Sequence, residues 1–299
     1  MSGTLQIYGI EKELKTIRQF ITPERLKELK KWRCYSEHEI SAAEKRLHTK
    51  LPPPVRDIYR YMGDLLITNG YLRPLELLHW EGKYLGFFLA PGEGVIIGIQ
   101  KGESSGNLYS WEENDPKEIA WEYEDELTDA CEEGDEEKKQ QVVAAYQKYW
   151  KKLNIPLIHA PLNICKLEND PRYNHILDGY GLFLVIHAIQ EWEEMTWREH
   201  TDEPHCLFSD FFPAEFSREY FQNLAKQIDV DYQPLSDHPE LIGLEGTPLQ
   251  MAYVHKDQQA LLILGDQPVA LKLLTRTVAE HDLIERLQEQ TGLTFHVGF

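Results

Sequence analysis

One stretch in the N-terminal third of the chain carries apolar residues at helical spacing. Ile40, Ala43 and Leu47 share one face of such a helix. Ser36 stands at the N-cap position, and Glu39, three residues later, completes the pattern of a capping box. The pattern therefore predicts a helix that begins directly after Ser36.

A run of three prolines, residues 52–54, interrupts this helix. Proline lacks the amide donor and restricts the residue before it, so the first helix cannot continue through the run. The last proline has its φ angle already set for a first helical turn. A second apolar stripe follows it, formed by Val55, Ile58, Tyr59 and Met62. We expect a second helix that starts at Pro54 and is ended by Gly63.

Residues 4–32 are expected to be mainly helical, with apolar positions along one side. After the proline corner the pattern changes to short apolar runs at about 84–90, 94–100 and 106–111. Turns that contain glycine separate these runs. They therefore predict three strands of an antiparallel meander.

Three different segments follow the meander. Residues 135–152 have apolar positions at helical spacing and predict a helix. Residues 154–178 are rich in proline and asparagine and predict irregular structure. The apolar run that starts at Gly181 has roughly nine residues, about half of what a membrane-spanning helix needs. It predicts a buried element over 181–192, for which its length slightly favours a helix over a strand.

The last third of the chain repeats the mixed pattern. Strand-like runs at 250–254, 260–264 and 269–274 precede a helical pattern at 278–290 and a short strand-like run at 293–297. Two interpretations stay open. This region is either a separate small α+β unit or the remainder of one enlarged domain.

Composition narrows the functional classes. The formal charge of −19 over 299 residues argues against a broad basic face for nucleic acid or for an anionic membrane. The N-terminal residues lack the cationic and apolar regions of a secretory signal, so we expect a cytoplasmic protein. The cysteines are too widely spaced for a zinc site or a disulfide framework, at Cys34, Cys131, Cys165 and Cys206.

Acidic residues are concentrated between positions 111 and 137. This block holds fourteen Asp and Glu residues and one Lys, so it carries −13 of the chain's −19. Such a block repels itself in a compact state. It is either an exposed solubilising segment or a docking surface for a cationic partner. Trp111, Trp121 and Tyr123 mildly favour docking, because aromatic side chains among acids can anchor a partner.

Other motifs give weak chemical signals. The G-x-S-x-G pattern at 102–106 lies between two predicted strands, where a hairpin turn is expected instead of a nucleophile elbow. His200 and His205 flank a turn-like segment, which predicts a surface loop and no metal site. His187 lies inside an apolar element and is expected to be a core residue. No phosphate-binding glycine motif follows a predicted strand, so no cofactor is expected.

The proline corner also carries a recognisable order of residues. The pattern E-x-x-L-x-x-x-L-P-x₆-Y is formed by Glu44, Leu47, Leu51, Pro52 and Tyr59. The run Leu72–Leu75 follows, and then come the strand-like runs 84–89 and 94–99. This order resembles the opening of the SMI1/KNR4 (SUKH) family. The resemblance extends over roughly residues 31–111, and more weakly over 155–195.

The resemblance implies an α+β fold, in which an antiparallel or mixed sheet packs with N-terminal helices and a late helix. On this basis we expect a SUKH-like domain over residues 1–199, with an acidic insertion at about 112–137. Residues 200–299 then form an α+β C-terminal extension, either separate or part of the same domain.

The resemblance also implies a function. Many bacterial members of this family look like immunity proteins, which bind and neutralise toxins delivered between competing cells, and those toxins are often nucleases. An acidic inhibitor can occupy the basic active face of a nuclease. The residues expected to contact such a cationic protein partner are Trp111, Trp121, Glu122, Tyr123, Glu124, Asp125, Glu126, Glu132 and Glu133.

Two alternatives remain beside this hypothesis. Fungal relatives of the family suggest an intracellular scaffold or regulator with several host partners. An enzyme, such as a hydrolase that uses Ser104 or the region of His200, is the third interpretation. We expect no catalytic residue, no metal and no nucleic-acid or membrane partner. The sequence does not predict the oligomeric state.

Overall fold

The computed structural model describes an α+β fold. The chain forms two compact units: Met1–Gly9 with Lys27–Leu177, and Ile10–Leu26 with Asp178–Phe299. These units divide the chain elsewhere than the predicted boundary at residue 199, and that domain division stays a prediction. The residues that the structure describes are 9–21, 23–29, 32–90, 95–102, 107–112, 123, 126–130, 133–152, 162–167, 176–199, 206–210, 232–235, 240–241, 250–257, 260–266, 269–275, 285–286, 288–289 and 296–297.

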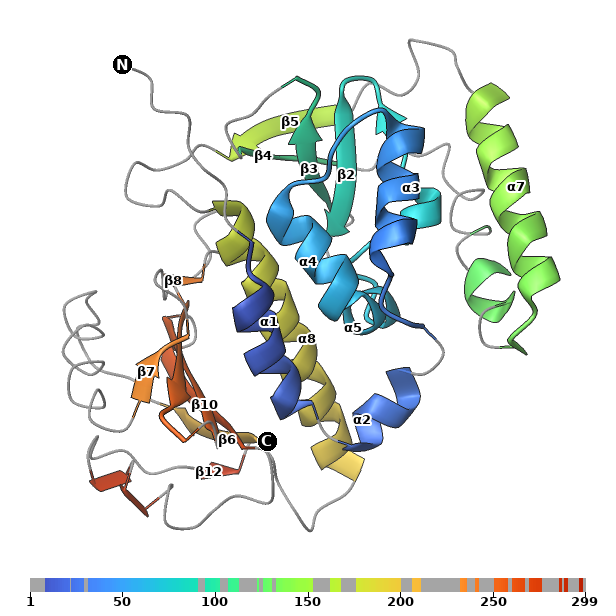
Figure 1. The fold of residues 1–299 in the computed structure, drawn as a ribbon. Coiled ribbons are helices and arrows are strands. Elements are labelled where there is room, and N and C mark those ends of the chain that lie inside the picture. Colours follow the sequence, from blue (N-terminus) through green and yellow to red (C-terminus); the bar gives the residue numbers. More distant parts are fainter. Residues whose placement is uncertain are drawn as a thin grey trace, which may run out of the picture. The chain divides into compact units, whose positions relative to one another are not determined.

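Helices dominate the N-terminal part, as the pattern predicts. They are α1 (Glu11–Ile17), η1 (Arg18–Phe20), α2 (Pro23–Glu28), α3 (Glu37–Leu47), α4 (Pro53–Tyr61) and α5 (Gly63–Thr68). Figure 1 shows α3, α4 and α5 together beside the first sheet. Residues 4–8 of the predicted helical region lie outside the described residues.

The predicted capping box at the start of α3 is confirmed. The Ser36 hydroxyl oxygen accepts a hydrogen bond from the Glu39 amide at 3.3 Å, and the Ser36 amide donates to the Glu39 carboxylate at 2.8 Å. The predicted apolar face is buried. The helix ends at Leu47, and its C-cap His48 takes a left-handed conformation with φ 52° before the prolines.

The second helix of the corner differs from its prediction at both ends. α4 begins at Pro53, one residue earlier than expected, because Pro52 serves as its N-cap. The prediction that Gly63 ends this helix is wrong. The helix ends at Tyr61, the backbone changes direction at Met62, and Gly63 is the first residue of α5. The turn at Met62 is made with a negative φ of −137°, so a glycine is not required there.

Residues of the E-x-x-L-x-x-x-L-P-x₆-Y pattern hold the corner together. The Glu44 carboxylate is almost fully buried and accepts hydrogen bonds from the Leu51 amide at 3.0 Å and from Lys50 at 2.6 Å, besides an ion pair with Arg56. Burial raises the pKa of Glu44, but these hydrogen bonds outweigh it and lower the pKa. The Tyr59 hydroxyl donates to the main-chain oxygen of Arg73 at 2.7 Å. The pattern is therefore a set of contacts that shape the fold.

The first sheet is an antiparallel meander of five strands in chain order. Its strands are β1 (Trp80–Glu81), β2 (Tyr84–Leu89), β3 (Val95–Gln100), β4 (Leu108–Glu112) and β5 (Leu162–Leu167). The three predicted strands correspond to β2, β3 and β4. The strand β5 lies in the region that we predicted to be irregular. That prediction is wrong there, because pairing with β4 satisfies the backbone of LNICKL despite the proline and asparagine residues around it.

A close glycine pair lets β2 and β3 approach under a large aromatic residue. Gly86 pairs with Gly98, and Trp111 on β4 packs over Gly86. A Cβ atom added at Gly86 would lie 2.9 Å from the indole ring, and one added at Gly98 would collide with the carbonyl oxygen of Leu85. Both positions therefore exclude any side chain.

The second unit contains a seven-stranded sheet in the order β12-β6-β11-β10-β9-β7, with β8 paired to β9. All of its pairs are antiparallel. The strands are β6 (Cys206–Asp210), β7 (Tyr232–Pro234), β8 (Glu240–Leu241), β9 (Gln250–His255), β10 (Ala260–Asp266), β11 (Val269–Thr275) and β12 (His296–Val297). Four consecutive residues of β10, 260–263, are buried, so both faces of this sheet are covered.

The predicted strands of the last third are confirmed as β9, β10, β11 and β12, whereas β6, β7 and β8 were not predicted. Of the predicted helix at 278–290, residues 285, 286, 288 and 289 are helical, and the others lie outside the described residues.

Two long helices complete the fold. α7 (Glu136–Lys152) begins one residue later than predicted, and α8 (Ile176–Glu199) extends the predicted buried element at both ends. From residue 177 to 189 almost every side chain of α8 that the structure describes is buried. Over the part of the chain that the structure describes, we find no helix with the length and apolar character to cross a membrane.

We predict that Gly98→Ala destabilises the protein by about 3 kcal/mol, because a methyl group there must displace main-chain atoms of β2. Gly63→Ala is the control. Its added Cβ would lie 3.6 Å from the nearest atom, on the Tyr35 ring, and alanine is the better helix former. We expect Gly63→Ala to change stability by less than about 1 kcal/mol, and urea unfolding of both variants measures the difference. Equal stability of the two variants would contradict the close strand approach.

Candidate partner-binding surface

The structure places the nine predicted contact residues in different environments. Glu126 and Glu133 are exposed, and Tyr123 is half-buried. Trp111 lies in the core with 1% of its surface exposed. The remaining five, namely Trp121, Glu122, Glu124, Asp125 and Glu132, lie outside the described residues.

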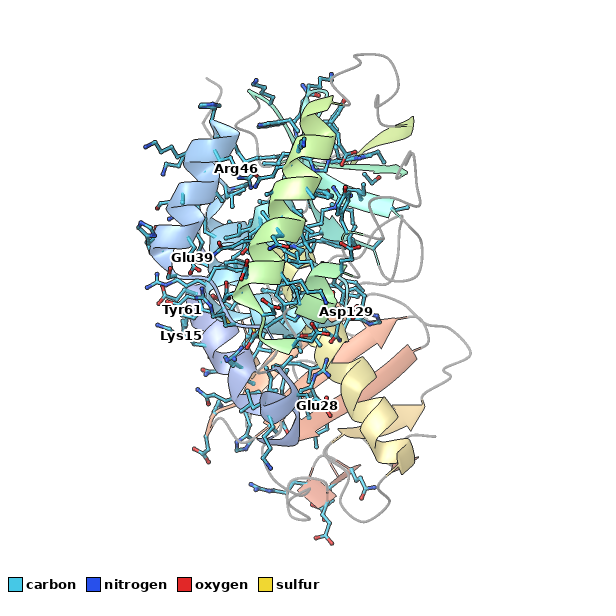
Figure 2. The ribbon with its side chains drawn as sticks, turned by 90° about the vertical axis from the view of Figure 1, so that its right-hand side faces the viewer. Lys15, Glu28, Glu39, Arg46, Tyr61 and Asp129 are labelled. Carbon is cyan, nitrogen blue, oxygen red and sulfur yellow. The ribbon has the colours of Figure 1, made fainter. Side chains whose placement is uncertain are left out.

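Exposed carboxylates gather on the helical segment 126–130, on residues 133–135 and on the first turn of α7. We call this set the acidic surface, and its members are Glu126, Asp129, Glu133, Asp135, Glu136 and Glu137. Figure 2 shows Asp129 beside one end of α7. The acidic block of the sequence therefore supplies a shared surface on this part of the fold.

The electrostatics of Lys138 show that these acids lie close together. Its ammonium group donates a hydrogen bond to Glu133 at 2.9 Å. This hydrogen bond, together with the negative charges of Glu133, Asp129 and Asp135, raises the pKa of Lys138. Because the ammonium is exposed, its ion pair with Glu133 contributes little to stability. The field around Lys138 nevertheless indicates a site that attracts cations.

Local contacts order the acidic surface. Leu127 and Ala130 are each 1% exposed, so the segment 126–130 is held by buried apolar side chains. The Asp135 amide donates to the carbonyl oxygen of Ala130 at 2.9 Å. The Asp135 carboxylate accepts from the amide of Lys138 at 2.9 Å, which is the geometry of an N-cap, so Asp135 starts α7. Ordered supports of this kind reduce the entropy that binding a partner would cost.

A column of rings leads from the half-buried Tyr123 into the core. The Tyr123 ring meets the Tyr146 ring edge-on, with 5.6 Å between their centroids. Tyr146, on α7, meets the His79 ring in the same way at 6.0 Å. Tyr146 is 2% exposed, so the half-buried Tyr123 is the ring of this column nearest to solvent.

Trp111 belongs to the structural core and is no candidate for partner contact in this fold. Its ring packs against Tyr84 with a centroid distance of 5.5 Å, and its indole N–H donates to the Glu81 carboxylate at 2.8 Å. The expected surface anchor is therefore an internal one. Its position next to the acidic block in the sequence did not reveal that its side chain points inward from β4.

A buried polar cluster that the sequence pattern did not predict lies next to Tyr146 of α7. The Glu81 carboxylate accepts from Arg73 at 2.9 Å and from Trp111, and His79 lies 3.6 Å away. Burial raises the pKa of Glu81, but the charge of Arg73 and these hydrogen bonds outweigh it and lower the pKa. The sequence contains one indication of this cluster. His79 and Glu81 are two residues apart, and residues at that spacing share one face of a strand.

His79 is held in its neutral form. Burial, together with the positive charge of Arg73, lowers the pKa of His79 to about 4, although Glu81 acts in the opposite direction. Its Nδ1 atom lies 2.9 Å from the carbonyl oxygen of Leu77. We assign the proton of the neutral ring to Nδ1, because a carbonyl oxygen only accepts. A neutral, hydrogen-bonded histidine stabilises the cluster without adding a second buried cation.

The structure describes the other chemical candidates only in part. Among the residues that the structure describes, no group of three His, Cys, Asp or Glu side chains is arranged to hold a metal ion. His187 on α8 is half-buried and stacks on Phe183 with a centroid distance of 5.6 Å. Ser104, His200 and His205 lie outside the described residues.

The chain was compared with protein-family models, with curated proteins and with solved structures. None of these three comparisons found a match. The resemblance to the SMI1/KNR4 family therefore stays a prediction that rests on the order of residues along the chain.

We predict that Glu81→Gln lowers the free energy of unfolding by about 3–5 kcal/mol, because it leaves the charge of the buried Arg73 uncompensated. The exposed Glu126→Gln is the matched control and should change stability by less than about 0.5 kcal/mol. Chemical denaturation followed by tryptophan fluorescence measures both variants. A Glu81→Gln protein as stable as the control would show that the cluster does not support the fold.

Proposed function

We propose that this chain is an immunity protein that binds and neutralises a cationic toxin domain through the acidic surface. The observation that carries the proposal is the clustering of six exposed carboxylates on ordered helical supports. The resemblance to the SMI1/KNR4 family supports it from the sequence side. The negative charge of the acidic surface supports a cationic partner independently of the resemblance to that family.

The chemistry of the acidic surface favours a basic protein over a small ligand. A nuclease binds a polyanion and therefore presents a basic active face, which an acidic protein can cover by imitating the charge of the substrate. Attraction between such faces raises association rates by about 10 to 10³-fold at low salt. A stable interface of about 1,600 Å² uses roughly 20–30 residues on each side, so the acidic surface forms one part of it.

The titratable groups inside the first unit support a binding role over catalysis. Among the carboxylates that the structure describes, those whose pKa is lowered are engaged in ion pairs: Glu39 with Arg33, Glu44 with Arg56, and Glu81 with Arg73. For Glu39, burial raises the pKa, but hydrogen bonds from Arg33 and Ser36 lower it to about 2. These ion pairs stabilise the fold. The exposed carboxylates of the acidic surface are therefore the ones that we propose to contact the partner.

A charge-matched pair of variants tests the proposal. The surface variant combines Glu126→Gln, Asp129→Asn and Glu133→Gln, and the control combines Glu28→Gln, Glu285→Gln and Glu289→Gln, all at exposed positions. Each variant removes three negative charges. Capture from the lysate of the source cell identifies the partner, and surface plasmon resonance then measures its binding. We expect the surface variant to lose at least about tenfold in association rate at low salt, while the control loses much less.

The partner must then prove to be toxic. Expressed alone in a host cell it should arrest growth, and coexpression of the wild-type chain should restore growth where the surface variant fails. Equal binding of the partner by both variants would move the contact to another face. Several non-toxic partners of moderate affinity would replace the proposal with the scaffold hypothesis.

A further inference from the structure

A group of basic side chains lies where α3 ends. The Trp80 indole N–H donates to the carbonyl oxygen of Leu47, the last residue of α3, at 2.8 Å. The Lys101 ammonium lies 5.6 Å from the centre of the Trp80 ring, and the Lys101 amide donates to the carbonyl oxygen of Lys83 at 2.7 Å. These contacts bring the C-terminal end of α3 together with the residues that flank β2 and β3. We call the exposed cations here the basic surface, and its members are Lys45, Arg46, Lys83 and Lys101.

The carboxylates of the segments that form this surface are engaged elsewhere. Over residues 40–51, 75–90 and 95–102, all of which the structure describes, no carboxylate is exposed. Those present are Glu44, bound to Arg56, Glu76, bound to Tyr35, and Glu81, bound to Arg73. The basic surface therefore carries positive charge that no exposed carboxylate of these segments offsets.

The basic surface lies apart from the acidic surface on the first unit. Figure 2 shows Arg46 at the C-terminal end of α3, well away from Asp129 beside one end of α7. The cations of α3 lie in its last turn, whereas the acids of α7 lie in its first turn. Each placement complements the dipole of its own helix. Together they give the first unit a cationic region and a separate anionic region.

We propose that two copies of this chain associate reciprocally, with the basic surface of each copy against the acidic surface of the other. A two-fold pair is the closed arrangement in which both contacts form at once. A second copy offers an anionic surface on ordered supports and receives a cationic one in return. The inference rests on the acidic surface of the proposed function, but not on the toxin. Because the pair covers the acidic surface, a cationic partner has to displace the second copy.

The net charge of −19 opposes association of two copies, so the distribution of this charge decides the outcome. Residues 111–137 carry −13 of it, which leaves −6 for the rest of the chain. In the reciprocal pair the acidic surface of this block faces cations. At about 0.1 M salt the Debye length is about 10 Å, so charges far from the contact are largely screened. Since each exposed ion pair contributes little, we expect a weak and reversible dimer.

Sedimentation equilibrium of the full chain, with no partner present, tests the inference. At about 0.1 M NaCl and about 100 μM chain we expect a monomer–dimer equilibrium without larger species. The lysine variant combines Lys45→Gln, Lys83→Gln and Lys101→Gln. Its control, which changes the net charge equally at exposed positions, combines Lys12→Gln, Lys27→Gln and Lys256→Gln. We expect the lysine variant, and NaCl at about 0.5 M, to raise the dimer Kd at least about tenfold, while the control leaves it unchanged.

The surface variant defined above gives a second, independent check. It removes three negative charges and so lowers the repulsion between two copies. If net charge alone governed association, the surface variant would dimerise more tightly than the wild type. A reciprocal pair predicts the reverse, a dimer Kd at least about tenfold higher, because the anionic half of each contact is lost.

A mixture of the lysine variant and the surface variant tests the reciprocal geometry. The mixed pair keeps one intact contact, whereas neither variant keeps one with itself. We expect the mixture to dimerise more tightly than either variant alone and less tightly than the wild type. A monomeric wild type would leave the basic surface to another anionic partner and overturn the proposal. A dimer that both variants leave intact, or a mixture no tighter than its components, would overturn it too. None of these results bears on the toxin, because no partner is present.

Discussion

The carboxylate of Glu81 is the point on which the first unit depends. It receives the guanidinium of Arg73 and the indole of Trp111, which come from different parts of the chain. Arg73 is in turn bonded through its main chain to β2, where its amide donates to Phe87, and to α4, whose Tyr59 donates to its carbonyl. Through Arg73 and Trp111, the buried carboxylate of Glu81 thus connects α4, β2 and β4 with the loop that leads to His79. Loss of one partner of a buried ion pair leaves an uncompensated charge and strongly destabilises the fold. The first unit therefore requires both Glu81 and Arg73.

The distribution of charge separates the interior from the surface. Inside the first unit two buried carboxylates are matched by basic side chains, Glu81 by Arg73 and Glu44 by Arg56. On the acidic surface the carboxylates outnumber the lysines beside them, and the fold tolerates this excess because helical supports hold it at the exterior. Repulsion stored at such a surface is relieved when a cationic partner binds. The helix α7, which carries part of this charge, contacts the neutral His79 through Tyr146.

Local patterns predicted the parts of the fold that depend on neighbouring residues. The capping box at Ser36, the proline corner and the strands around Gly86 follow from short-range chemistry, and the structure has them. The strand β5 was missed because its identity comes from pairing with β4, which lies far earlier in the chain. Gly63 was misplaced because a glycine after an apolar stripe signals a helix end, whereas here the chain turns at Met62.

The candidate site was less predictable than the fold. Exposure of Glu126 and Glu133 follows from their charge, but the inward direction of Trp111 depends on the register of β4 against β3. Arg73, His79 and Glu81 lie within nine residues of the sequence, but Trp111 joins them only when the sheet brings β4 to Glu81. In the sequence the cluster shows no more than an alternating His and Glu. Residues of the family-like pattern, such as Glu44 and Tyr59, prove to hold the corner, so the pattern marks a fold and leaves the target open.

Hydrogen exchange of the chain with and without its captured partner is the most direct measurement of whether recognition occurs at the acidic surface. Amides of residues 126–130 and of the first turns of α7 should gain protection in the complex, while β9, β10 and β11 of the second unit stay unchanged. Protection confined to the second unit, or to the exposed face of α3, would contradict a binding role for the acidic surface.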